Sequence, residues 1–423
     1  MVLFTLIIHI LLICCSFVLF RVRFKRNRKT FFLNVPLYLL FYGLFYISLP
    51  AIVSLVTNFS WVGASQNTIL ATAQIGLYFN VIFLLGYVFS HNSASSLYYR
   101  PQLPQAQLVF TARIMATLIF AYISGLIIVN LPELIGILGQ RSSQSLLNIV
   151  FEEKYKVRPL YIFQIIIVSY LFLNSKNIKN AIYLIPFVLL SGLLSNREYL
   201  LGAVIVVFVL NVFNGNIIKF RYLIITVLLI AFVSAVRSLV NGFKVDHLLS
   251  VFGEFEFTWC TTHLMYDSDV AQEIIPTFVY SIMRVFPSGL YNLVFGQYNS
   301  YTTISSELNP LGWGLAGSIV AEAIAFKSLL ITALYPILMV LYGYLINILI
   351  RTNMLSGYIL FVLVIFYIQQ IFRFSFLEFA MYPFYSVFFP GFWIVLIDIF
   401  TLAKRKSSLS TSVDSTKDVG LAC

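Results

Sequence analysis

Four arginines stand at or near the ends of apolar segments of this chain. They are Arg197 in SNREY, Arg237 in SAVRS, Arg284 in SIMRVFPSG and Arg373 in QQIFRF. A guanidinium stays charged and offers planar, bidentate donors that match phosphate oxygens. These arginines are therefore candidates for a diphosphate-binding pocket, with Arg237 as the weakest member. Alternatively, each arginine only anchors its helix among lipid headgroups, and for any single one both interpretations stay open.

Three other side chains are candidates to accept a proton from an attacking hydroxyl group. Glu322 is the only acid in the apolar run 311–326 and is the preferred base, with His263 and Glu254 behind it. A structural role is the alternative for each of them. The sequence has no HExxH or similar metal-ligand spacing and no nucleotide-binding loop. We therefore expect neither a metal nor a cofactor.

The composition is that of a membrane protein. Of 423 residues, 60% are hydrophobic and 10% are charged, whereas a soluble domain is about half apolar and a quarter charged. The net charge of +11 is spread over short segments between apolar runs. Basic residues in such places orient helices in a bilayer, so we expect a lipid bilayer and no nucleic acid as the partner of this charge.

Apolar runs long enough to span a bilayer recur along the whole chain. A spanning helix needs roughly 20 mostly apolar residues, and we predict an all-α polytopic protein with about eleven spans. The predicted spans are 2–20, 31–57, 68–90, 108–130, 159–174, 178–195, 199–217, 222–240, 328–350, 356–372 and 383–402.

The distribution of basic residues predicts the orientation. One alternate set of connections, including RVRFKRNRK and the tail after Lys404, is consistently basic and is assigned to the cytoplasm. The N-terminus is then outside and the C-terminus inside. Four regions follow: spans one to eight within 1–240, a large outer loop at 241–327, the last three spans within 328–402, and a polar tail at 403–423 that we predict to be disordered. A loop of that length is where function is expected.

Two predicted spans flank the turn that carries Arg197. If these helices are only Ala181–Ser195 and Tyr199–Phe213, each covers about 22 Å at 1.5 Å per residue. The hydrocarbon layer is about 30 Å thick. Arg197 would then lie below the outer membrane surface, which favours a functional role.

The chain resembles the Wzy-type O-antigen polymerases, which are oligosaccharide repeat unit polymerases of the bacterial inner membrane. The resemblance covers the helical layout, the large outer loop and three local features. LLSNREYLLG is similar to the short Ser-x-Arg turn of the family, here Ser195 and Arg197, and LGWGLAGSIVAEAIAFKS is similar to its Gly-rich stretch leading to a Glu, here Glu322. IFRFSF places Arg373 at a late helix end, as such proteins often do.

This resemblance implies a glycosyltransferase that uses undecaprenyl diphosphate-linked oligosaccharides on the periplasmic face. It would transfer the growing glycan from its lipid carrier to the non-reducing end of a new lipid-linked unit, with the arginines on the diphosphate and Glu322 as base. A chain-length regulator is a further partner that the family implies. Two alternatives stay open: an O-antigen ligase, and a flippase or transporter of lipid-linked oligosaccharides.

Overall fold

The computed structural model describes residues 1–26, 31–58, 60, 62–90, 106–137, 141–175, 177–194, 197–213, 258–287, 293, 308, 317–352 and 354–400, with the backbone alone at 141–146, 197 and 201. The described residues form helices and turns. The α-helices are α1 (Val2–Arg26), α2 (Val35–Gly43), α3 (Leu49–Thr57), α4 (Gln66–Phe89), α5 (Ala106–Val129), α6 (Leu131–Gly136), α7 (Arg141–Glu153), α8 (Val157–Ser175), α9 (Ile185–Leu193), α10 (Arg197–Phe213), α13 (Ile274–Met283), α16 (Ile319–Ala325), α17 (Leu329–Arg351), α18 (Leu355–Arg373), α19 (Phe376–Phe379) and α20 (Tyr382–Phe388). A π-helical turn, η1 (Leu44–Ser48), joins α2 to α3, and a 3-10 helix, η2 (Ile178–Leu184), precedes α9. Residues 258–267 and Phe392–Phe400 are also helical.

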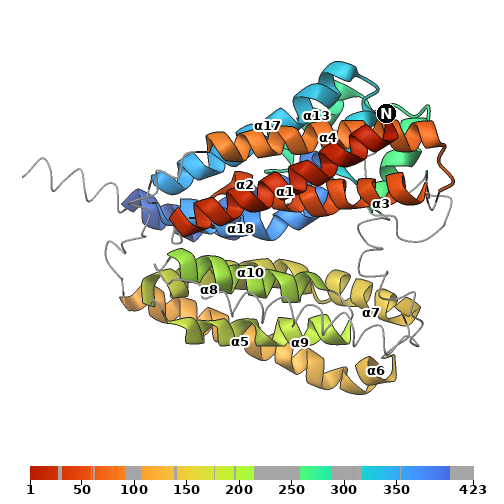
Figure 1. Cartoon of the computed structure of the whole chain (residues 1–423). Helices are drawn as coiled ribbons and strands as arrows, with labels where there is room; N and C mark the ends of the chain where they lie inside the picture. Colours follow the sequence, from red (N-terminus) through yellow and green to blue (C-terminus); the bar gives the residue numbers. More distant parts are fainter. Residues whose placement is uncertain are drawn as a thin grey trace, which may run out of the picture.

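The long helices form two groups that run roughly side by side (Figure 1). One group contains α1, α2, α4, α17 and α18, and the other contains α5, α8, α9 and α10. The groups meet where α18 packs against α8 and α10. A Cβ atom added at Gly202 of α10 would lie 2.5 Å from the Phe366 ring of α18. The absence of a side chain at this position therefore lets the two helices approach closely.

Helix α18 forms the centre of the described molecule. Inside its most apolar stretch, 89% of the residues are buried, compared with 22% in α1. An all-round apolar helix that is buried belongs to the interior of a bundle, whereas an exposed apolar helix suits contact with lipid. The C-terminal end of α18 carries Arg373, so this arginine is placed next to the most enclosed part of the bundle.

The all-α polytopic membrane class is confirmed, but the expected eleven spans are not. In the part of the chain that is described, seven helices are long and apolar enough to cross a membrane, or eight if the pair Phe376–Phe388 and Phe392–Phe400, bent by 59°, is one span. The segments predicted as spans 178–195 and 199–217 form the shorter apolar helices Ile178–Leu193 and Glu198–Phe213. At 1.5 Å per residue the second of these is about 24 Å long, which agrees with the short helices expected beside Arg197.

Several predicted segments lie outside the described residues. These are the span 222–240, most of the loop 241–327 and the tail 403–423. The described parts of the loop contain helices at 258–267, Ile274–Met283 and Ile319–Ala325 and pack on the bundle. Thr68 of α4 donates a hydrogen bond of 2.7 Å to Asp267, and Trp259 is completely buried against the backbone of α4 at Gly76.

Candidate functional site

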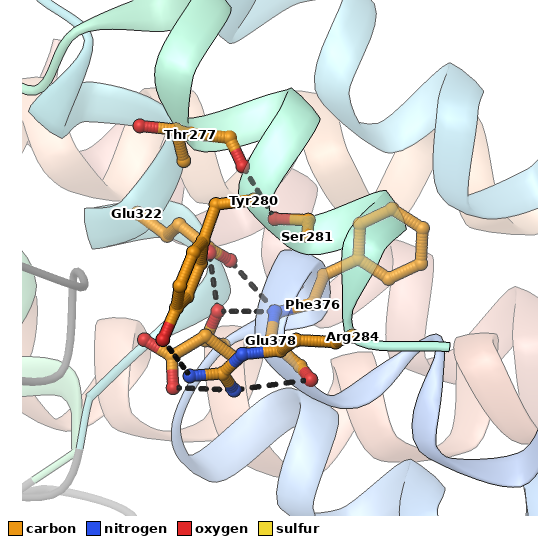
Figure 2. A network of polar contacts seen from close by, with 8 residues as sticks. Thr277, Tyr280, Ser281, Arg284, Glu322, Phe376 and Glu378 are labelled. Atoms are coloured by element: carbon orange, nitrogen blue, oxygen red, sulfur yellow. Dashed lines mark hydrogen bonds and ion pairs between the residues drawn. The ribbon is translucent and has the colours of Figure 1, made fainter. Parts of the chain in front are cut away.

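A buried ion pair links the region after α13 to the region after α18. Arg284 follows the last residue of α13, and its Nη1 lies 3.2 Å from Oε2 of Glu378 in α19. The two side chains are only 10% and 9% exposed. Nη2 of Arg284 donates to the Tyr280 hydroxyl at 3.4 Å, as Figure 2 shows. Removing such a pair from water costs free energy, which the mutual attraction and extra hydrogen bonds offset.

Aromatic rings enclose this guanidinium. Its central carbon is 4.9 Å from the centre of the Tyr280 ring and 5.7 Å from that of Tyr382, at the start of α20. Aromatic faces attract cations, and more strongly where water is excluded. Arg284 is therefore held by side chains from α13, α19 and α20, and it also donates to the backbone oxygen of Glu378 at 3.4 Å.

Glu322 lies beside this pair in the short helix α16 and is completely buried. It accepts hydrogen bonds from the Tyr335 hydroxyl, from the Ser375 hydroxyl and, at 2.7 Å, from the backbone N–H of Phe376. Burial raises the pKa of Glu322 to about 7; the Ser375 and Tyr335 hydroxyls oppose the shift, and the nearby Glu378 adds to it. The carboxyl group can therefore exchange a proton near neutral pH.

Ser375 connects Glu322 to the ion pair. Its hydroxyl caps α19 by accepting the backbone N–H of Glu378 at 3.0 Å, while it donates to Glu322. The sequence Ser-x-x-Glu is a capping-box pattern that starts a helix. The chain of contacts runs from Glu322 through Ser375 to Glu378 and Arg284, so Glu322 fixes the short segment between Arg373 and Glu378.

A second ion pair lies at the same end of the molecule. Nη2 of Arg158, the second residue of α8, is 3.2 Å from Oε1 of Glu198 in α10. Arg373 at the end of α18 is also close enough to Glu198 for their charges to interact. Arg197 begins α10, so its backbone adjoins Glu198, although its side chain is not among those described.

Three arginines of the predicted diphosphate pocket are thus located, and the rest of the set is not. The structure places Arg284, Arg373 and the backbone of Arg197 at one end of the molecule, which we call the Arg284 end. Arg237 and Glu254 lie outside the described residues. Their roles stay predictions.

His263 is buried among neutral groups close to this end. Its Nδ1 lies 3.0 Å from the Ser60 hydroxyl, and its side chain has no exposed surface. Burial lowers its pKa to about 4, although Asp267 opposes the shift. The imidazole is therefore neutral at neutral pH. The neighbouring Thr262 donates a hydrogen bond to the Ser318 hydroxyl, and Ser318 is the N-cap of α16. The helix of residues 258–267 therefore supports α16.

The sequence analysis missed four contributors: Tyr335, Ser375, Tyr382 and Arg158. The Ser-x-x-Glu pattern of residues 375–378 was a local signal for a helix start beside Arg373. Glu378 lies 94 positions after Arg284 in the chain, and Glu198 lies 40 positions after Arg158. Such pairings depend on the fold and have no local signal.

Among the described residues, no group of three His, Cys, Asp or Glu side chains is arranged to hold a metal ion.

The chain matches no family model, no curated protein and no solved structure.

Proposed function

We propose that this chain is a membrane glycosyltransferase that polymerises oligosaccharide repeat units carried on undecaprenyl diphosphate, at the extracytoplasmic face of a bacterial inner membrane. The observation that carries the proposal is the group of arginines at the Arg284 end, which come from α10, α18 and the end of α13. Charged groups within a membrane domain are costly and usually serve a function.

The diphosphate explains why several arginines are needed. It is the group that activates the donor sugar, and it is also the leaving group, so negative charge grows on it as the glycosidic bond breaks. Guanidinium groups fixed in an enclosed site stabilise that charge more than water does. Arg197, Arg284 and Arg373 are assigned to this role, with Arg237 as a weaker fourth.

The reaction balances without a cofactor. A hydroxyl oxygen at the non-reducing end of the new lipid-linked unit attacks the anomeric carbon of the growing glycan. The bond from that carbon to the diphosphate oxygen breaks, undecaprenyl diphosphate leaves with the electron pair, and the hydroxyl proton passes to a base. Glu322, His263 and Glu254 remain the proposed proton acceptors.

The described contacts of Glu322 support a role in positioning the neighbouring segment at least as well as a role as proton acceptor. Its carboxylate is enclosed by Tyr335, Ser375 and the Phe376 amide. A base must come within hydrogen-bond reach of the proton it removes. In the described arrangement Glu322 instead holds the segment that carries Glu378, the partner of Arg284.

The proposal is tested first in cells. Deletion of the gene should collapse the surface-polysaccharide ladder to core plus one repeat unit, and the wild-type gene should restore it. Loss of a ligase would instead leave no repeat unit on the core. A normal ladder would contradict the proposal and would direct attention to transport of lipid-linked sugars.

The second test uses purified protein in lipid nanodiscs with undecaprenyl diphosphate-linked repeat units. The expected products are a ladder of longer lipid-linked glycans and free undecaprenyl diphosphate, in equal numbers of transfers and released carriers. Intact substrate after incubation with folded protein would reject the polymerase. A regulator of chain length is expected to change the length distribution and not the chemistry.

A further inference from the structure

Arg158 is a partly exposed arginine to which the sequence analysis assigned no role. It is the second residue of α8, and its side chain is 33% exposed, while that of its partner Glu198 is 14% exposed. The pair is therefore more accessible than Arg284 and Glu378, at 10% and 9%. A ligand reaching this end of the molecule meets Arg158 more readily than Arg284.

Tyr382 connects the two arginines. Its ring lies 5.7 Å from the Arg284 guanidinium carbon, and it is close enough to Arg158 for an electrostatic interaction. Tyr367 of α18 stacks on Tyr382 at 5.8 Å and also interacts with Arg158. Arg158 and Arg284, which are far apart in the sequence, therefore both lie near Tyr382.

The Glu198 carboxylate lies among several cations. It contacts Arg158 at 3.2 Å, interacts with Arg373, and follows Arg197 in the chain. Among the described side chains, Arg158 and Arg373 are the cations that interact with Glu198, and Glu152 is also close enough to Arg158 to interact. A guanidinium has five N–H donors, and the contact to Glu198 is made through Nη2. Donors of Arg158 thus remain for a second anion.

We infer that Arg158 is an additional diphosphate-binding residue and that Glu198 is its exchangeable counter-ion. The inference rests on the proposed function, because it assigns a new residue to the site where the lipid diphosphate is bound. Arg158 and Arg284 both lie near Tyr382, so both can meet one anionic ligand at the Arg284 end. Glu198 keeps Arg158 in place when no anion is bound.

The test compares variants with opposite expectations. Binding of undecaprenyl diphosphate to protein in neutral-lipid nanodiscs is measured for wild type, R158Q, E198Q and R113Q, with undecaprenol as the uncharged probe. Arg113 is an exposed arginine within α5 and serves as the matched control. R158Q should weaken binding about tenfold to a hundredfold, the effect of losing one charge-assisted hydrogen bond. E198Q should bind as tightly as wild type or more tightly, because it removes the competing anion.

Thermal unfolding midpoints separate binding from folding. If Arg158 and Glu198 only stabilise the fold, R158Q and E198Q break the same pair, so both should lower the midpoint and weaken binding alike. That result, or unchanged binding in R158Q, would overturn the inference. R158K, which keeps the charge but not the planar fork, should lie between R158Q and wild type. If wild type binds undecaprenol and its diphosphate equally, the proposed function fails as well, which is a different outcome from failure at Arg158 alone.

Discussion

The two ends of the helical bundle satisfy their charged groups in different ways. At the end opposite the Arg284 end, which we call the Arg23 end, Arg23 of α1 donates to the backbone oxygen of Tyr87 at 2.6 Å and so caps the C-terminus of α4. Asp398 accepts the backbone N–H groups of Leu355 and Ser356 at 2.9 and 2.8 Å, at the start of α18. These charges close helix ends, where carbonyl and amide groups lack partners.

At the Arg284 end the partners are mostly side chains. Arg284 bonds Glu378 and Tyr280, and Arg158 bonds Glu198. A backbone partner cannot move aside without unwinding its helix, whereas a side chain can turn about its own bonds while the helix stays intact. The Arg23 end is therefore suited to anchoring, and the Arg284 end is suited to exchanging a counter-ion for a ligand. The two interpretations of arginines at helix ends, anchoring and ligand binding, are tested by comparing variants at the two ends.

The largest effect is expected from removing a charge at the Arg284 end. R284Q should lower polymerisation in nanodiscs by about a hundredfold to a thousandfold, the usual effect of losing a group that stabilises charge in the transition state. It also leaves Glu378 buried without its cation, which is destabilising. The double variant R284Q/E378Q removes that cost and should recover the unfolding midpoint without recovering activity.

R23Q is the matched control at the other end. It should lower the unfolding free energy by about 1–2 kcal/mol, because carbonyls of α4 lose a donor, while activity per folded molecule stays near wild type. If R23Q loses as much activity as R284Q, the two ends do not divide into an anchoring end and a ligand-binding end.

A smaller effect on activity is expected from changing Glu322, a buried carboxylate that contacts the start of α19. In E322Q the amide oxygen can accept from Phe376 and Tyr335, and the amide NH2 can donate to the Ser375 hydroxyl, which has a second lone pair. A positioning role for Glu322 predicts activity within about tenfold of wild type, whereas the role of general base predicts a loss of about 10²–10⁴-fold. E322A, which removes every contact, should be much less active than E322Q.

D398N is the corresponding change at the Arg23 end. Both Asp398 oxygens accept backbone N–H groups, and an asparagine has only one oxygen, so one amide loses its acceptor. The expected cost is about 1–3 kcal/mol of unfolding free energy, with normal activity per folded molecule. An E322Q protein that folds normally but is as inactive as E322A would support the role of base predicted from the sequence.

Much of the fold could be predicted because the bilayer requires long apolar helices. The runs 2–20, 68–90, 108–130, 328–350 and 356–372 correspond to α1, α4, α5, α17 and α18, and α18 ends at Arg373 as expected. The run 383–402 is interrupted instead. The break lies between Phe388 and Phe392 and contains Pro390 and Gly391. A Cβ atom added at Gly391 would lie 2.9 Å from the Ser386 oxygen, so this Pro-Gly pair allows a sharp bend that average hydropathy does not detect.

The candidate site was only partly predictable. Arginines and a lone Glu are conspicuous in an apolar sequence because their burial is costly, which is why Arg284, Arg373 and Glu322 were chosen as candidates. Arg158 lies among other charges in EEKYKVR, where nothing distinguishes a buried group from an exposed one. Its assignment needs α8 and α10 side by side, a contact set by tertiary packing.

The smallest expected effect is a pH dependence of stability specific to the Arg284 end. Burial raises the pKa of Glu322 from 4.5 to about 7, so between these values the folded protein holds a proton that the unfolded chain releases. Stability from this group is present below about pH 4.5 and is lost as the pH rises through about 7. His263, whose pKa burial lowers to about 4, acts in the opposite direction.

The difference in stability between wild type and E322Q isolates the Glu322 carboxyl group, because His263 is present in both. Wild type should lose on the order of 1–2 kcal/mol relative to E322Q between pH 5 and pH 7.5, measured as unfolding midpoints in detergent. The same difference taken with R23Q should be flat over this range, since an arginine does not titrate there. If stability depends on pH in the same way in wild type and E322Q, the Glu322 carboxyl group titrates as in the unfolded chain. Its contacts would then only stabilise the start of α19, as the backbone contacts of Asp398 stabilise the start of α18 at the Arg23 end.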